Sequence, residues 1–213
     1  MTINCKGEEL ILSEERAIYW ARKRMLIVSD LHIGKSAHFR KHGLQVPDSV
    51  GLTDLQRLGK LMETFSPEIL LVTGDMFHNQ LNSDADAFIE WRKRYPGLRV
   101  LLIKGNHDDL KEEDYVMSDI EVYQKELLCA PFRFIHDKPK TFDEYYNISW
   151  HIHPGVVLYG RAKQRLKFPC FYFSPTCAVL PAFSVFTGLF VISPKADEQF
   201  YAVTPGKVIL VPQ

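Results

Sequence analysis

Side chains that commonly bind metal ions follow three short apolar runs in the first half of the chain. The runs span residues 25–28, 69–72 and 101–103, and the polar residues after them are Asp30, His32, Asp75, Asn106, His107 and Asp108. An apolar run that stops abruptly is typical of a buried strand that delivers polar groups to the rim of a sheet. Ligands of α/β proteins bind at this rim, outside the carboxyl ends of the strands. Asp, His and Asn suit divalent ions such as Mn, Fe or Zn, so the pattern predicts a metal site.

Two later stretches add imidazoles to this set. The alternating run 132–135 ends at His136, and the run 148–150 is followed by His151 and His153. Each piece has an ordinary explanation, because an Asp after a strand is usually a helix cap, Gly-Asn is usually a turn, and a lone His is usually a core residue. Under those explanations, six polar groups at strand ends would coincide by chance, so we favour a metal site. His136 is identified by its position rather than by a local motif.

The elements that position these residues alternate in type. The spacing of apolar residues predicts one helix from residue 48 or 49 to before Pro67, and another from residue 83 or 84 to before Pro96. Alternation of strands with helices predicts right-handed crossovers and a largely parallel sheet. The remaining expectations are an N-terminal hairpin (10–12 with 17–20) and a second, mixed sheet in the C-terminal third. The acidic, irregular stretch 110–125 is either a helix or an excursion over the surface.

Composition sets the outer limits. The chain has 213 residues, of which 46% are hydrophobic, so we expect one domain, residues 1–213, with a substantial core. Its 26 basic and 26 acidic residues give a formal net charge of zero, so attraction to nucleic acid or lipid must come from a local patch. We find no signal peptide and no apolar run of the ~20 residues that span a bilayer. Four scattered cysteines argue against a zinc knuckle or a disulfide framework, and fit a reducing cytoplasm.

In combination, these motifs resemble those of a known superfamily. Asp30-x-His32, Gly74-Asp75, Gly105-Asn106-His107-Asp108, His136 and His151-x-His153 follow one another as in the calcineurin-like metallophosphoesterases. The resemblance implies an α/β fold, a four-layer sandwich of two mixed β-sheets flanked by helices. It also implies two divalent ions, with manganese as the first expectation and iron or zinc as alternatives.

Residue roles carry over with the resemblance. Asp30, His32 and His153 would hold the first ion, and Asn106, His136 and His151 the second, with Asp75 between them. Two cations roughly 3.5–4 Å apart bind phosphate oxygens and lower the pKa of a bridging water, whose hydroxide is then the nucleophile. His107 would protonate the leaving alkoxide, and Asp108 would orient the His107 ring.

A closer resemblance is to the ligase-associated DNA damage response endonucleases. It rests on five segments: 36–40, 74–78, 91–92, 160–171 and 180–188. It implies a phosphodiesterase or nuclease in bacterial DNA repair, with DNA as substrate and a DNA ligase and a helicase-like protein as partners. The sequence departs from this branch at Trp150, Ser184 and Leu189, where the branch usually has glycine. We expect the bulky Trp150 to change the packing behind the second ion.

Candidate substrate contacts lie outside the metal motifs. Arg161, Lys163, Arg165 and Lys167 occupy alternate positions, so on a strand they would share one face that matches the phosphates of a nucleic acid backbone. His38 and Arg40, in the basic segment 34–43, and His78 are further candidates. The alternatives are a charged strand edge exposed to solvent and a solvated loop or short helix.

Two other functions share the same motifs. A phosphatase or cyclic-nucleotide phosphodiesterase acting on small molecules would look identical in sequence. A non-catalytic scaffold that keeps a metal for structure and recruits repair partners is a further alternative. The retained His107 argues against the scaffold, because a structural metal site has no use for an acid that is not a ligand.

Overall fold

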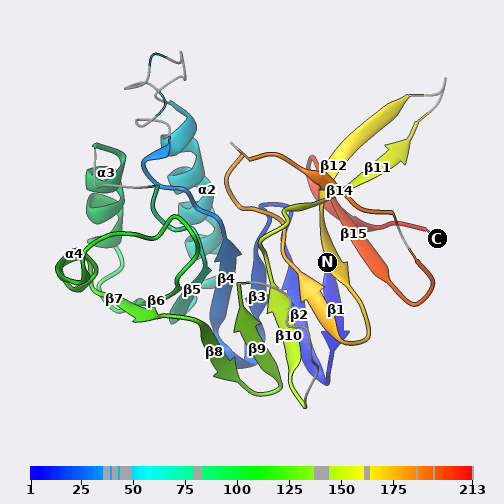
Figure 1. The fold of residues 1–213 in the computed structure, drawn as a ribbon, viewed down its shortest axis with the longest axis horizontal. Helices are drawn as coiled ribbons and strands as arrows, with labels where there is room; N and C mark the ends of the chain where they lie inside the picture. Colours follow the sequence, from blue (N-terminus) through cyan, green and yellow to red (C-terminus); the bar gives the residue numbers. More distant parts are fainter. Residues whose placement is uncertain are drawn as a thin grey trace.

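Two β-sheets pack face to face in the computed structural model, with α-helices on the outer side of the first sheet (Figure 1). The structure describes residues 1–35, 39, 43, 49–78, 83–136, 144–160, 164–185, 187–193 and 195–212. In these residues no helix is long and apolar enough to cross a membrane. The expected α/β class with two mixed sheets is confirmed.

The first sheet has seven strands in sequence order. They are β1 (Thr2–Cys5), β2 (Glu8–Leu12), β3 (Ile18–Trp20), β4 (Met25–Ser29), β5 (Ile69–Thr73), β6 (Arg99–Ile103) and β7 (Ile120–Tyr123). Strands β1–β4 pair antiparallel, which confirms the hairpin of β2 and β3, and a short 3-10 helix, η1 (Ala21–Lys23), precedes β4. Strands β4–β7 are parallel, so the carboxyl ends of β4, β5 and β6 meet at one edge.

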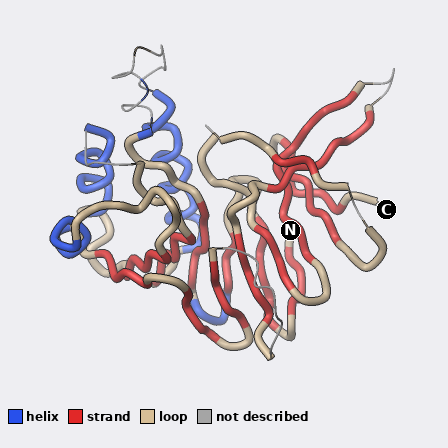
Figure 2. The backbone as a smooth tube through the Cα atoms, in the orientation of Figure 1, coloured by secondary structure: helices blue, strands red, loops and turns tan. Residues whose placement is uncertain are grey.

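Three helices cross between the parallel strands. They are α2 (Ser49–Phe65), α3 (Ser83–Arg92) and α4 (Glu112–Met117), and all described α-helices lie on one side of the molecule (Figure 2). The first two agree with the helices predicted from apolar spacing. Of the two alternatives for 110–125, the helix is present as α4, whereas the strand β7 in the same stretch was not predicted. A six-residue helix is too short for a periodic pattern to show.

The second sheet has nine strands and follows the order β14-β11-β12-β13-β10-β9-β8, with β15 pairing with β12 and β16. They are β8 (Glu126–Cys129), β9 (Phe132–Ile135), β10 (Tyr146–Ser149), β11 (Pro154–Tyr159), β12 (Arg165–Phe173), β13 (Cys177–Val179), β14 (Phe190–Val191), β15 (Gln199–Thr204) and β16 (Lys207–Leu210). The outer halves of β11 and β12 form a two-stranded ribbon that projects from the body (Figure 1).

Alternate side chains of the parallel strands enter two different cores. Leu26 and Val28 pack among helix residues such as Leu58 and Trp91. Ile27, between them, faces the second sheet in a cluster that includes Phe134, Ile148 and Phe171. Burial on both faces explains why these strands read as continuous apolar runs rather than as alternating ones. The helices, the first sheet and the second sheet therefore form successive layers that hold the strand ends in place.

Candidate metal centre

The loops after β4 and β5 run side by side and continue the parallel pairing. Asp30 N–H donates to the carbonyl of Gly74 at 3.1 Å, and His32 N–H donates to that of Asp75 at 2.9 Å. The segment 181–184 closes the other side, because Ser184 N–H donates to the carbonyl of Asp30 at 3.2 Å. Backbone hydrogen bonds therefore fix both acidic residues at the sheet rim.

Asp30, His32 and His153 converge from both sheets. One ligand atom of each lies within 4.8 Å of the others, and Asp30 Oδ1 is 3.2 Å from His153 Nε2. Asp30 is fully buried, and the described residues supply no well-formed hydrogen bond to either of its carboxylate oxygens. Burying such a carboxylate is costly without a compensating cation. The buried, under-satisfied carboxylate beside two imidazoles fits a metal ligand set.

Burial also shifts the protonation of this group. It raises the pKa of Asp30, although the neighbouring His153 opposes the shift. It lowers the pKa of His32 to about 2, so this ring is neutral, which is the form that binds a metal. Both shifts have the same cause, removal of the charged form from water.

The backbone is left-handed at four of the predicted ligands. The φ angles are +51° at Asp30, +50° at His32, +48° at Asp75 and +44° at His153. Such angles are uncommon for residues other than glycine, and they cluster at functional sites, where the surrounding structure holds them. The residue types do not indicate a left-handed backbone at these positions, and we did not predict it from the sequence.

Asp75 connects the first group to the loop after β6. Its carboxylate is mostly buried, and Oδ1 accepts a hydrogen bond from His107 N–H at 2.8 Å. The loop approaches Asp75 closely because residue 105 is glycine. A Cβ there would lie 2.3 Å from Asp75 Oδ1 and 2.6 Å from Asp75 N. Gly105 is thus needed at this position because a side chain there would collide with Asp75.

The His107 ring is exposed and lies beside the candidate ligands. Its centroid is 5.7 Å from that of His32 and 5.0 Å from that of His78. The structure therefore groups His78, a candidate substrate contact, with His107 and His32. His38, Arg40, Arg161 and Lys163 lie outside the described residues. Arg165 lies at the outer end of β12, where its guanidinium covers the Tyr159 ring at 5.6 Å.

Asp108 does not take the expected role of orienting His107. Its Oδ1 accepts a hydrogen bond from Phe77 N–H at 3.0 Å, and its Oδ2 accepts one from Gly105 N–H at 2.9 Å. The carboxylate is buried between the two loops, whereas the His107 ring is exposed, which explains the difference. Burial raises the pKa of Asp108 to about 6, and the two backbone donors oppose the shift. Asp108 fastens the loop after β6 to the loop after β5.

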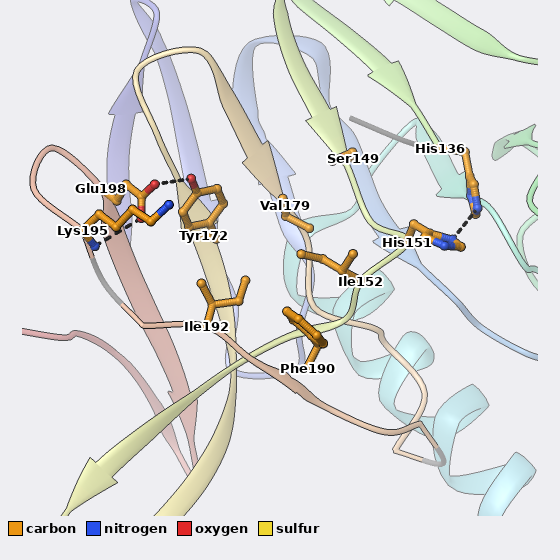
Figure 3. A pocket seen from close by; sticks show the side chains of 10 residues that line it. All are labelled: His136, Ser149, His151, Ile152, Tyr172, Val179, Phe190, Ile192, Lys195 and Glu198. Atoms are coloured by element: carbon orange, nitrogen blue, oxygen red, sulfur yellow. Dashed lines mark hydrogen bonds between the residues drawn. The ribbon is translucent and has the colours of Figure 1, made fainter. Parts of the chain in front are cut away.

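His136 and His151, the histidines predicted for the second ion, meet at the ends of β9 and β10. Figure 3 shows the two rings side by side, with His151 Nδ1 2.8 Å from His136 Nε2. Among the described His, Cys, Asp and Glu side chains, no third one joins this pair in a group like that of Asp30, His32 and His153. Asn106 is exposed on the loop after β6.

Trp150 fills the space behind this pair. It is fully buried, and its ring centroid lies 5.6 Å from that of His136. A Cβ on Gly74 would lie 2.1 Å from the indole nitrogen, so the tryptophan needs a glycine at that position. Leu189 likewise packs closely against a glycine, because a Cβ on Gly155 would lie 3.0 Å from the Leu189 Cβ. The large residues at 150 and 189 each pack against a glycine elsewhere in the chain.

Residues 23–172 match the family model of the calcineurin-like phosphoesterases. The chain belongs to this family. Among solved structures, nuclease MPE of Pseudomonas putida matches this phosphoesterase at 32% identity and a TM-score of 0.84, over 99% of each chain. The expected superfamily and the two-sheet fold are thereby confirmed.

Two further structures are similar to a lesser degree. The protein of unknown function AQ665 from Aquifex aeolicus is 20% identical, with a TM-score of 0.42 over 65% of this chain and 81% of its own. The E. coli phosphoesterase Yfce is 14% identical, with a TM-score of 0.47 over 88% of this chain and 97% of its own. At these TM-scores we draw nothing from either. The comparison with curated proteins found no match.

Proposed function

We propose that this calcineurin-like phosphoesterase is a nuclease that hydrolyses phosphodiester bonds of DNA with two divalent ions, manganese first. The observation that carries the proposal is the buried Asp30 carboxylate with His32 and His153 around it, in a chain similar along its whole length to nuclease MPE. DNA repair and the ligase and helicase partners remain predictions from the resemblance, and a cytoplasmic location remains a prediction from the scattered cysteines.

The residues fit a metal centre of this kind. Asp30, His32 and His153 would hold one ion, and Asn106, His136 and His151 the other, with Asp75 shared. Two divalent ions bound there would offset charge on the reacting phosphate and lower the pKa of a water molecule. The buried Asp30 carboxylate, which lies 3.2 Å from His153 without a well-formed hydrogen bond, and the 2.8 Å approach of His136 to His151 support this assignment.

The chain itself contributes a proton donor and its support. The His107 ring is exposed beside His32, where it can reach a leaving alkoxide and protonate it. Its backbone N–H is tied to Asp75, and Asp108, which accepts a hydrogen bond from Gly105 N–H within the same loop, ties that loop to Phe77. These bonds reduce the reorganisation needed to align the acid.

The β11–β12 ribbon supports a nucleic acid substrate. Arg165 and Lys167 are exposed at alternate positions of β12, so they share a face, and Tyr159 beside Arg165 is 73% exposed. Cations spaced along a strand suit backbone phosphates, and an adjacent aromatic ring suits an unpaired base. Because the net charge of the chain is zero, we expect electrostatic attraction to DNA to come from this local patch.

A side-by-side assay tests the proposal. The protein is stripped with EDTA, reloaded with Mn, Fe or Zn, and given single-stranded DNA, a 2′,3′-cyclic nucleotide and a phosphomonoester. We expect DNA cleavage that requires metal, and at most slow turnover of the other two substrates. Exclusive turnover of the monoester or of the cyclic nucleotide would contradict a nuclease. Absence of all turnover, together with tight binding of a repair partner, would favour a scaffold.

The close approach of Gly105 to Asp75 gives a sharper prediction. In Gly105→Ala the new methyl group would displace the Asp75 carboxylate, and misplacement by about 1 Å can cost on the order of 100-fold in rate. Gly97→Ala is the matched control, because its Cβ would meet nothing within 4 Å. We expect Gly105→Ala to lose DNA cleavage at an unchanged circular dichroism spectrum. Equal rates for the two variants would refute the steric role.

A further inference from the structure

A cavity of about 570 Å³ opens next to His136 and His151 (Figure 3). Its middle is apolar, formed by Ile152, Val179, Phe190 and Ile192. Its far end is polar, formed by Tyr172, Lys195 and Glu198. The volume lies within the range of roughly 300–1,000 Å³ that is usual for pockets that bind small ligands. A part of the protein outside the candidate ligand set therefore offers a binding site.

The cavity adjoins the candidate metal centre, because one segment of the chain contributes to both. Ile152 lies between His151 and His153, so the segment that brings two predicted ligands to the rim also lines the cavity. Phe190 N–H donates to the carbonyl of His153 at 3.0 Å, which fixes the β14 strand against the same segment. Any group held by His151 thus has the cavity as its immediate neighbour.

Phe190 gives the cavity an exposed aromatic wall. The side chain is 63% exposed, at the edge of the sheet, with Ile152 beside it (Figure 3). An apolar slot with an accessible ring suits a flat heterocycle, since stacking on an aromatic ring depends little on which base is present.

The polar end is ordered. The Tyr172 hydroxyl donates to Glu198 Oε1 at 2.8 Å, and Lys195 N–H donates to Glu198 Oε2 at 3.2 Å. Burial, helped by this carboxylate, raises the pKa of Tyr172 to about 12, so the hydroxyl keeps its proton. The ordered hydrogen-bonding groups can meet the polar edge of a base whose faces lie in the apolar middle.

From this arrangement we infer that the cavity holds an unpaired nucleobase of the nucleotide next to the cleaved phosphodiester, stacked on Phe190. The inference rests on the proposed nuclease function and names the part of the substrate that is bound. A phosphodiester bound at the ion that His136 and His151 would hold carries a nucleoside on each side. The cavity is the space beside these two histidines. The base accounts for the apolar walls and the polar end together.

Single-stranded oligonucleotides with one abasic residue at successive positions test the inference. Stacking of about 1–3 kcal/mol per base corresponds to a roughly 5- to 150-fold effect on rate. We therefore compare the rate of cleavage of one bond in two strands, one intact and one with an abasic residue beside that bond. Wild-type protein should cut the bond on one side of the abasic residue at least about fivefold more slowly than in the intact strand. In Phe190→Ala this local suppression should fall below about twofold. Leu210→Ala, at a similarly exposed apolar residue away from the cavity, should keep the wild-type pattern.

The pattern separates binding from a structural effect. A structural role of Phe190 would slow cleavage at every position and leave the ratio between positions unchanged. A second measurement, in EDTA so that no bond is broken, follows the fluorescence of 2-aminopurine in the strand. Wild-type protein should quench it by stacking, and Phe190→Ala should quench it less.

The outcomes distinguish this inference from the proposed function. DNA cleavage with no suppression at abasic positions, or with the same suppression in Phe190→Ala, would overturn the base site and leave the nuclease standing. Absence of DNA cleavage with every metal would overturn both.

Discussion

Asp30→Asn is expected to abolish phosphodiester hydrolysis and, at the same time, to stabilise the metal-free protein. Loss of the carboxylate should cost at least about 10³-fold in turnover, because metal stabilisation of transition-state charge is worth several kcal/mol and about 1.4 kcal/mol is tenfold. In the absence of metal, the buried Asp30 carboxylate has the His153 ring 3.2 Å away but no well-formed hydrogen bond. Removing it should raise the free energy of unfolding by about 1–3 kcal/mol.

The measurement combines initial rates with urea unfolding, in EDTA and in Mn²⁺. At 100 times the dissociation constant, metal binding should stabilise wild-type protein by about 2.7 kcal/mol, and Asp30→Asn should lose this gain. Asp86→Asn, on the exposed side of α3, is the matched control. An Asp30→Asn protein that is active, or that is less stable than wild type in EDTA, would contradict the assignment.

Arg57→Met is expected to lower the free energy of unfolding by about 3–5 kcal/mol. Removing one partner of a buried ion pair leaves the other charge uncompensated, which accounts for losses of about this size. Arg57 donates to Asp54 Oδ1 at 2.8 Å, to Glu15 Oε2 at 2.6 Å and to the Phe183 carbonyl at 2.8 Å. Burial already raises the pKa of Asp54, and Arg57 opposes that shift.

Urea unfolding of Arg57→Met and Arg99→Met tests this prediction. Arg99 pairs with Glu121 at 2.9 Å, but both side chains are about half exposed or more, so its loss should cost at most about 1 kcal/mol. The double variant Arg57→Met, Asp54→Leu should recover part of the loss, because the more deeply buried of the two acidic partners is then removed, and Glu15 is partly exposed. Similar losses of unfolding free energy for Arg57→Met and Arg99→Met would show that the buried network around Arg57 does not contribute more to stability than an exposed ion pair.

Arg57 also supports the candidate metal centre indirectly. It holds the carbonyl of Phe183, and Phe183 N–H donates to the carbonyl of Ser29, next to Asp30. Arg16 reinforces the same segment through the carbonyls of Ala182 and Ser184. The buried guanidinium of Arg57 and the half-buried guanidinium of Arg16 thus brace the strand end that carries the first predicted ligand.

The parallel half of the fold was predictable because its physical signal is local and strong. Strands β4, β5 and β6 are apolar on both faces, and the polar residues after them indicate where each strand ends. Helices α2 and α3 carry enough turns for apolar spacing to show. The short α4 and β1 lack that length, so a helix in 110–125 was only one of two alternatives and β1 was not predicted.

The details of the site depend on contacts between distant segments. The approach of His153 to Asp30 joins two sheets, and only the family resemblance suggested it. The left-handed backbone at His32 and the hydrogen bonds of Asp108 arise from how two loops meet, which residue types do not reveal. The cavity beside Phe190 likewise forms from β14 and its neighbours in the folded chain.

Anomalous diffraction from crystals soaked in Mn²⁺ tests the central claim most directly. We predict one peak coordinated by Asp30, His32 and His153, and a second coordinated by Asn106, His136 and His151, with Asp75 between them. Peaks only at other surfaces, or none in protein that cleaves DNA, would contradict the account.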